Sequence, residues 1–380
     1  MRERAPMRRA EISISAIRAN LDRVRAVSGT DTIIAVLKSN AYGHGMIPVA
    51  EAVAAGGAAI IGVADIDEAL SLREGGITIP VLCWLHGSDP DFRAAYAADI
   101  ELGISTLAQL DLLAEEVRAG DRGGAPGTIH LKIDTGLSRN GLAERDWDRV
   151  FARAAELEQA GLIRVRGIFS HLANTNHEAD LAQAAVFDDG VARLAAAGID
   201  PELKHLASTA AAFRSPHLHY SAVRVGIGLY GLSPYRGVSS AELGLTPAMT
   251  LRTEIVHLRE VPAGTGVSYG HTYVTDRPTT LALVAMGYAD GMPRAVNGTD
   301  VTVQIRGERY PIVGRIGMDQ ILVDLGAQGV DIEVGECATM FGDPATGAPA
   351  VEEWSEAMDT INYEIVVGIG PRVKRLLVNE

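Results

Sequence analysis

The sequence predicts an α/β protein in which an N-terminal (β/α)8 barrel is followed by a mostly-β domain. Over the first two-thirds of the chain, short apolar runs alternate with helical segments rich in Ala, Leu and Glu, which is typical of βαβ units and a parallel sheet. Near Pro247 this alternation stops, and β-branched runs separated by Gly and Pro follow, as in antiparallel sheets. We place the barrel domain in residues 1–240 and the β domain in residues 241–380. Roughly the first ten residues are candidates for packing with the β domain.

The barrel prediction depends on counting the apolar runs. Eight strands over about 210 residues fit a barrel, which typically takes about 250 residues. An open doubly wound sheet is the alternative, but the first βα turn at residues 38–45 lacks the Gly-x-Gly-x-x-Gly pattern of dinucleotide folds. The eight candidate strands are Thr32–Leu37, Ala59–Ala64, Pro80–Leu85, Glu101–Ile104, Ile129–Ile133, Val165–Ser170, Leu203–Leu206 and Ala222–Val225. The clearest helices between them are Asp65–Glu74, Thr106–Ala119, Glu178–Ala197 and Ser208–Arg214.

The C-terminal third shows alternating or β-branched runs instead. A linker with Pro and Gly, Gly231–Leu245, precedes them. The predicted strands of this domain are Thr250–Arg259, Thr279–Met286, Val301–Ile305, Gln320–Leu325 and Ala338–Phe341.

Composition excludes several classes of protein. With 34 basic and 48 acidic side chains the net charge is −14, which argues against a nucleic-acid-binding surface. The two cysteines, Cys83 and Cys337, are far apart, so neither a disulfide framework nor a zinc site is indicated. The basic start lacks a following apolar stretch, and no run is long enough to cross a membrane. We therefore predict a cytoplasmic protein without a membrane partner.

Polar residues follow most of the predicted barrel strands, at the end where barrel enzymes build their sites. Capping residues are common there, so a single one proves little, but a group on one rim indicates a site. The residues in question are Lys38, Tyr42, Lys132, Asp134, Arg139, His171, Ser208, Thr209, Arg224, Gly226 and Ile227.

Two of these features have a chemical interpretation. Lys38 follows an apolar strand, where desolvation lowers a lysine pKa and provides the neutral amine for covalent attachment to a carbonyl compound. The simpler alternative is a lysine whose amine reaches back to solvent. Gly226-Ile-Gly228 follows the last strand, where glycine amides and the hydroxyl of Thr209 can approach a phosphate.

Longer motifs identify a family. Residues 35–45 (AVLKSNAYGHG) closely resemble the cofactor-lysine signature of alanine racemases that use pyridoxal 5′-phosphate. Further matching motifs follow in the same order through both predicted domains, which makes the resemblance highly specific. It implies the family fold, an N-terminal barrel plus a C-terminal β domain. The matching segments are residues 133–141, 167–173, 224–231, 267–270, 287–291, 314–319 and 361–364.

The resemblance implies roles for individual residues. Lys38 would hold the cofactor and act as the base on one face of the substrate, and Tyr269, from the partner subunit of a homodimer, would be the base on the other face. Arg224, held by His171, would face the pyridine nitrogen. Tyr42, Ser208, Thr209, Gly226, Ile227 and Tyr363 would bind the cofactor, mostly at its phosphate.

The remaining implied roles concern the substrate. Arg139 would bind the substrate carboxylate, helped by Met318 of the partner subunit, and Lys132 matches a lysine that is often carbamylated. Tyr288 and Tyr363 would line the entrance. The implied activity is interconversion of L- and D-alanine, with D-alanine supplied for peptidoglycan.

The residue types suit racemisation, which removes a proton from one face of a carbon and returns one to the other. Tyr is a poor base near neutrality, so we expect positive charge from His171 or Arg224 near Tyr269. Arg224 cannot readily give up a proton, which would keep the pyridine ring unprotonated. Without the flanking motifs, Tyr269 would be interpreted as an ordinary exposed tyrosine, and His171 would equally be a core histidine. His217 and His219 lack further ligands, so we predict no metal site.

Two departures and three rival functions remain open. Ser208 and Gly317 stand where many family members have Asn and Cys, which can alter substrate preference. The rivals are a serine or broad-specificity racemase, a decarboxylase of the same barrel class, and a non-catalytic cofactor-binding barrel. The decarboxylase would need an acidic partner for the pyridine nitrogen, and Arg224 occupies that position.

Overall fold

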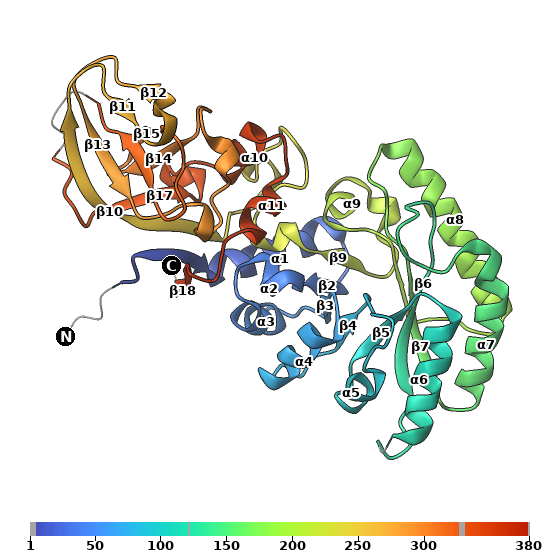
Figure 1. Cartoon of the computed structure of the whole chain (residues 1–380). Coiled ribbons are helices and arrows are strands. Elements are labelled where there is room, and N and C mark those ends of the chain that lie inside the picture. The colour runs from blue at the N-terminus through green and yellow to red at the C-terminus, as the bar shows by residue number, and fades with distance from the viewer. Residues whose placement is uncertain (1–4, 121, 327–330, 379–380) are drawn as a thin grey trace.

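The computed structural model confirms the predicted fold class, a (β/α)8 barrel followed by a mostly-β domain, and describes residues 5–120, 122–326 and 331–378 (Figure 1). The barrel sheet has the order β8-β7-β6-β5-β4-β3-β2-β9, with parallel pairing throughout. Backbone hydrogen bonds between the segments around β8 and β9, the first and last strands of this order, close the barrel. Arg224 N donates to Ala207 O at 2.9 Å, and Ser221 N donates to Lys204 O at 3.1 Å. The barrel strands are β2 Ile33–Val36, β3 Ile60–Val63, β4 Val81–Cys83, β5 Glu101–Ile104, β6 Gly127–Lys132, β7 Ile163–Phe169, β8 Leu203–His205 and β9 Val223–Val225.

Helices surround the barrel, and their starts follow the sequence signals. Asp65 and Thr106 accept hydrogen bonds from the backbone N–H groups of Glu68 and Gln109, as N-caps do. Both residues stand at the first position of helices predicted from the sequence. The helices of this domain are α1 Ile14–Ser28, α2 Lys38–Tyr42, α3 Met46–Ala55, α4 Ile66–Glu74, α5 Phe92–Ala97, α6 Leu107–Ala119, α7 Trp147–Gln159, α8 His177–Ala196 and α9 Thr209–Arg214.

The C-terminal domain is a second eight-stranded sheet, of order β13-β16-β15-β14-β17-β10-β1-β18, that curls so that β10 also pairs with β13. All its pairings are antiparallel except β1 with β18. Its strands are β1 Arg8–Ser13, β10 Met249–Val261, β13 Thr279–Val284, β14 Thr302–Ile305, β15 Glu308–Val313, β16 Ile321–Asp324, β17 Cys337–Phe341 and β18 Lys374–Val378. Two short strands, β11 Gly266–Val267 and β12 Tyr273–Val274, and the helices α10 Val351–Ala357 and α11 Asn362–Val367 complete it.

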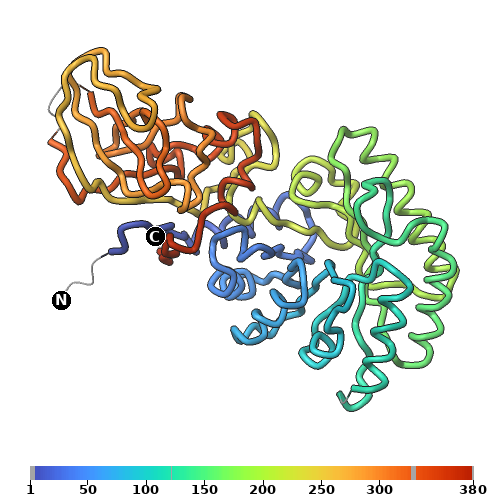
Figure 2. Tube along the Cα trace, in the orientation of Figure 1, coloured from blue at the N-terminus to red at the C-terminus, as the bar shows by residue number. Residues whose placement is uncertain are grey.

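The two ends of the chain meet in this sheet, as the tube in Figure 2 shows. β1 lies between β10 and β18, before the chain enters the barrel through α1. The sequence did not predict β1, β15, β18, α10 or α11, because each is short and lacks strong periodicity. Of the ten N-terminal residues, the first four lie outside the described residues. Among the described residues, no helix is both long and apolar enough to cross a membrane.

One buried amide ties the barrel to the segment that leaves it. Asn20 of α1 is 1% exposed, and its Nδ2 donates to the carbonyls of Leu229 and Thr246 at 3.1 and 2.8 Å. Its Oδ1 accepts from Thr246 N at 2.9 Å. A buried polar group with all its partners stabilises the fold, and its loss leaves those partners unpaired.

We therefore expect Asn20→Ala to lower the free energy of unfolding of the cofactor-free protein by about 3 kcal/mol. Arg18→Ala, an exposed change on the same helix, should alter it by less than about 0.5 kcal/mol. Urea unfolding followed by circular dichroism measures both. Equal midpoints for the two variants would contradict this role of Asn20.

Candidate active site

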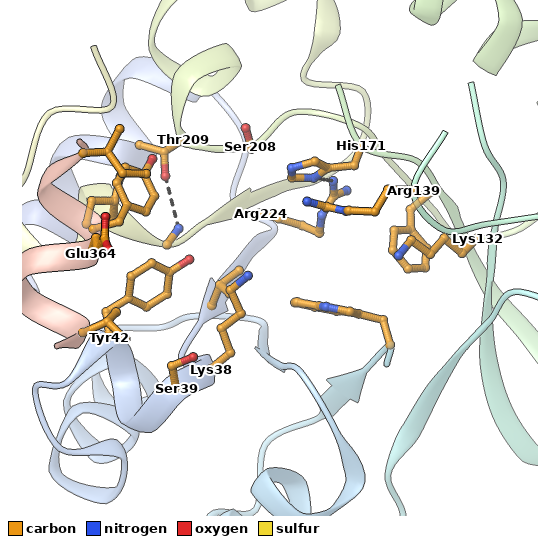
Figure 3. Close-up of a pocket in the computed structure, with 18 residues that line it drawn as sticks. Lys38, Ser39, Tyr42, Lys132, Arg139, His171, Ser208, Thr209, Arg224 and Glu364 are labelled. Atoms are coloured by element: carbon orange, nitrogen blue, oxygen red, sulfur yellow. Dashed lines mark hydrogen bonds between the residues drawn. The ribbon is translucent and has the colours of Figure 1, made fainter. Parts of the chain in front are cut away.

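A cavity of about 450 Å³ opens where the barrel strands end (Figure 3). Its volume lies in the range of small-molecule sites. The predicted site residues that line it come from both domains: Lys38, Tyr42, Lys132, Arg139, His171, Ser208, Thr209, Arg224, Gly226, Ile227 and Tyr363. The residues that sequence analysis did not place there are mostly apolar or aromatic: Val36, Ser39, Trp84, Phe169, Ile361, Glu364 and Val367. Ile361 and Glu364 lie in a motif that matched the family, and this was the signal available for them.

Lys38 opens an unusual turn directly after β2. The next four residues, Ser39 to Tyr42, have φ between 51° and 55°, so α2 is a left-handed turn. Lys38 and Tyr42 therefore stand at its two ends, and both side chains point into the cavity (Figure 3). Burial, reinforced by the charge of Arg139 and opposed by Glu68, holds the pKa of Lys38 below its ordinary value. This favours a reactive neutral amine.

The cavity is electropositive. Lys38, Lys132, Arg139 and Arg224 all line it, and among the lining residues that the structure describes Glu364 alone carries a carboxylate. Burial and the neighbouring charges of Arg224, Arg139 and Lys38 lower the pKa of Lys132 to about 8. Such a site favours a ligand with more than one anionic group, such as a phosphate and a carboxylate.

One wall of the cavity is suited to a phosphate. Thr209 Oγ1 accepts from Gly226 N at 3.1 Å, and a Cβ at position 226 would overlap the hydroxyl of Tyr42. The glycine therefore lets backbone, phenol and hydroxyl groups converge. Burial raises the pKa of Tyr363 to about 12 and that of Tyr42 further, so both phenols stay protonated donors. Ser208 precedes α9 and its carbonyl accepts from Ala212 N at 2.8 Å.

Arg224 of β9 also lines the cavity and is 5% exposed. Its Nη2 donates to Ser170 O at 2.6 Å and lies 3.3 Å from His171 Nδ1. Burial lowers the pKa of Arg224 to about 9, which leaves the guanidinium charged at neutral pH. Burial and the charge of Arg224 lower the pKa of His171 to about 3, so His171 is neutral. The positive charge that the sequence assigned to His171 or Arg224 therefore resides on Arg224.

A chain of buried hydrogen bonds runs from Arg224 through the barrel interior. Its Nη1 lies 3.0 Å from His205 Nδ1, and His205 Nε2 lies 2.9 Å from His130 Nδ1. His130 Nε2 lies 2.8 Å from Glu101 Oε2, and Glu101 is also paired with Arg166. These residues were not among the predicted site residues. The available signal was a His or Glu in three of the predicted strands, Glu101–Ile104, Ile129–Ile133 and Leu203–Leu206.

The chemistry of Arg224 determines the direction of every proton in this chain. A guanidinium can only donate, so His205 Nδ1 must accept and His205 must carry its proton on Nε2. That proton points at His130 Nδ1, which leaves the His130 proton on Nε2 facing Glu101. Burial raises the pKa of Glu101, but the hydrogen bonds from His130 and Arg166 and the Arg166 charge outweigh it, so the pKa lies below its usual value. Glu101 is thus an ionised acceptor.

Three predicted residues do not line the cavity of their own chain. Tyr269, Tyr288 and Met318 belong to the C-terminal domain and are 71%, 43% and 54% exposed. Tyr269 lies between β11 and β12, which Figure 1 shows in the part of that domain away from the barrel. The family resemblance implies that Tyr269 and Met318 act at the cavity of a second copy of the chain.

The histidines after α9 have structural surroundings. His219 Nδ1 lies 2.8 Å from Ser28 O, and the His217 ring packs edge-on against His177. In the described part of the chain, no three His, Cys, Asp or Glu side chains gather closely enough to hold a metal ion.

Comparisons with known proteins cover nearly the whole chain. Residues 12–234 match the family model of the alanine racemase N-terminal domain, and residues 248–377 match that of its C-terminal domain. Alanine racemases from Mycolicibacterium smegmatis and Salinispora tropica are 44% and 43% identical, over 98% and 94% of this chain and 95% of theirs.

Solved structures agree with this. The alanine racemase from Streptomyces lavendulae superposes with a TM-score of 0.95 at 41% identity, covering 100% of this chain and 98% of that one. The Bacillus anthracis alanine racemase, solved with bound L-Ala-P, has a TM-score of 0.85 at 32% identity, with 99% and 96% covered.

We expect His205 and His130 each to carry the proton on Nε2 at pH 6–8, because Arg224 donates at one end of the chain and Glu101 accepts at the other. Long-range ¹⁵N–¹H correlation spectra of histidine-labelled protein report the tautomer directly, with His130→Gln and His205→Gln used for assignment. An Nδ1–H tautomer at either ring would contradict this direction of donation from Arg224 to Glu101.

Proposed function

Because the chain belongs to the alanine racemase family, an isomerase family, we propose that it interconverts L- and D-alanine with bound pyridoxal 5′-phosphate as a cytoplasmic homodimer. The observation that carries this proposal is one cavity that combines a desolvated lysine, a wall where Gly226 and Thr209 meet, and a buried arginine. The proposed biological role is supply of D-alanine for peptidoglycan.

The cavity residues fit this cofactor. Tyr42, Thr209, the backbone at Gly226 and Tyr363 would hold its phosphate, and Lys38 would hold it covalently. When bound, the cofactor supplies an electron-withdrawing ring that acidifies the α-hydrogen of an amino acid. Arg224, whose Nη1 and Nη2 already donate to protein acceptors, has Nε–H left to donate to the ring nitrogen. Since arginine cannot accept, that nitrogen would stay unprotonated.

The substrate carboxylate would bind at the electropositive end of the cavity. Arg139 is the proposed partner, with Met318 of the partner subunit beside it. The lowered pKa of Lys132 raises the neutral fraction of its amine near neutral pH, and the neutral amine can add carbon dioxide with release of a proton. The resulting negative carbamate would hold Arg139 in place by charge-assisted hydrogen bonds.

Racemisation requires a base on each face of the α-carbon, one protonated when the other is not. Lys38 would serve one face, and Tyr269 of the partner subunit the other. The exposure of Tyr269, Met318 and Tyr288 supports this arrangement, because each would be covered on dimer formation. The charge of Arg224 would stabilise the phenolate of the incoming tyrosine.

The alternatives differ in substrate or in the bond that breaks. Ser208 lines the cavity and Gly317 precedes Met318, and both depart from the commonest family residues, so a serine or broader racemase is the second candidate. A decarboxylase is disfavoured by Arg224, because an acidic partner to the ring nitrogen is what that chemistry would use.

We expect the cofactor-loaded protein to convert L-alanine to the D-enantiomer at least about tenfold faster, in kcat/KM, than L-serine or L-lysine. Chiral chromatography of reactions with the three amino acids measures this. Carbon dioxide release is followed in the same reactions. Faster turnover of serine, or carbon dioxide in place of D-alanine, would select the corresponding alternative.

Complementation between two inactive variants tests the shared site. Lys38→Ala and Tyr269→Ala homodimers should each be nearly inactive. After mixing under conditions of subunit exchange, activity should recover toward about a quarter of the wild-type value, because half of the dimers then hold one intact site of two. Lys38→Ala mixed with Lys38→Ala is the matched control. If Tyr269 served its own chain, the mixture would stay inactive.

A further inference from the structure

The left-handed turn that follows Lys38 needs external support. Its four residues from Ser39 to Tyr42 all have positive φ, and none is glycine. A left-handed conformation is unfavourable for most residues other than glycine, because it brings the Cβ too close to the following carbonyl oxygen. A turn of this kind persists only where its surroundings hold it. The contacts that hold it therefore also hold the two side chains at its ends.

The barrel supplies part of this support. The carboxylate of Glu68 accepts from Ser39 N at 2.6 Å and from Ala64 N at 2.8 Å. The ring of His44 is fully buried, and its Nδ1 lies 3.1 and 2.9 Å from the carbonyl oxygens of Ala41 and Tyr42. Because only a donor can satisfy two carbonyls, this nitrogen carries the proton. These bonds hold the start of the turn at Ser39 and its end at Ala41 and Tyr42.

The C-terminal domain supplies the rest through Arg375 of β18. Its Nε donates to Gly43 O at 2.9 Å, directly after the turn. Its Nη1 donates to Gly370 O and Val373 O at 2.7 and 2.9 Å, and its Nη2 to Ile369 O at 2.6 Å. The rigid fork of the guanidinium thus joins the barrel turn to the backbone just before β18.

The two backbones are also in close contact beside this fork. A Cβ at Gly43 would overlap the carbonyl oxygen of Val366 in α11. One turn away in α11, the ring of Tyr363 lies 6.1 Å from that of Tyr42, centroid to centroid. The turn, α11 and the segment before β18 therefore form one packed unit that contributes to the cavity from both domains.

We propose that Arg375 is a positioning residue, which fixes the left-handed turn, and with it Lys38 and Tyr42, by tying Gly43 to the C-terminal domain. This proposal rests on the proposed roles of Lys38 and Tyr42, but the contacts of Arg375 on which it is based are present in the cofactor-free chain. It implies that the placement of the cofactor lysine depends on docking of the C-terminal domain of the same chain.

Hydrogen exchange of the full-length, cofactor-free protein tests this. The amides of Ala41, Gly43, His44 and Gly45 are all hydrogen-bonded within the turn or to Leu37, so their exchange reports its opening. We expect Arg375→Lys, which keeps the charge and loses the fork, to speed exchange in residues 38–45 about tenfold, and Arg375→Ala to speed it more. Lys374→Ala, at the exposed neighbouring position, is the matched control and should leave it unchanged.

A second measurement links the turn to binding. Pyridoxal 5′-phosphate, titrated by absorbance, should bind the Arg375→Lys protein several-fold more weakly than the Lys374→Ala protein. Unchanged exchange in residues 38–45 would overturn the proposal. The proposal would also be overturned if exchange rose equally in β13 or if both Arg375 variants failed to fold. Either result would show that Arg375 supports the fold in general and not the turn in particular. Failure of alanine turnover in the unaltered protein would overturn the proposed function and leave the exchange result intact.

Discussion

The buried charge of Arg224 constrains the whole interior of the barrel. A guanidinium removed from water must find acceptors for its N–H groups, because an unpaired buried charge is very costly. Here backbone carbonyls at the ends of β7 and β8 supply them, at Ser170 and His205. The side chains of His205, His130 and Glu101 then continue the pattern, each accepting from the previous group and ending on a carboxylate held by Arg166. The same arrangement makes Arg224 a fixed donor at the cavity.

The cavity is not a property of the barrel alone. Most of its charged groups follow barrel strands, whereas Tyr363 and Glu364 come from α11 of the second domain. The interleaving of the chain ends supports this connection, since β1 enters the C-terminal sheet before the barrel begins and β18 pairs beside it. Docking of the two domains therefore affects the geometry of the site directly. The exposed Tyr269 and Met318 extend the same dependence to a second copy of the chain in the proposed dimer.

The electrostatics of the cavity suit one class of ligand. Several cations share a small volume, and burial together with their mutual repulsion lowers the pKa of both Lys38 and Lys132. A ligand with a phosphate and a carboxylate would relieve this repulsion, and the two anions would occupy opposite ends of the cavity. In the unliganded protein the same repulsion favours neutral lysines, which is the state that covalent chemistry needs.

The fold class and most of the cavity could be predicted from the amino-acid sequence, because apolar runs mark strands and parallel strands all end at one rim. Lys38, Lys132, His171 and Arg224 could be grouped on that basis without coordinates. The contact between His130 and His205 emerged only in the folded chain, since it depends on the register of neighbouring strands. The left-handed turn could not be predicted either, because Ser39, Ala41 and Tyr42 have no intrinsic preference for positive φ and adopt it through contacts with other residues. These contacts come from Glu68, His44 and Arg375. The contacts with Glu68 and Arg375 join residues far apart in the chain, and local sequence carries no signal for them.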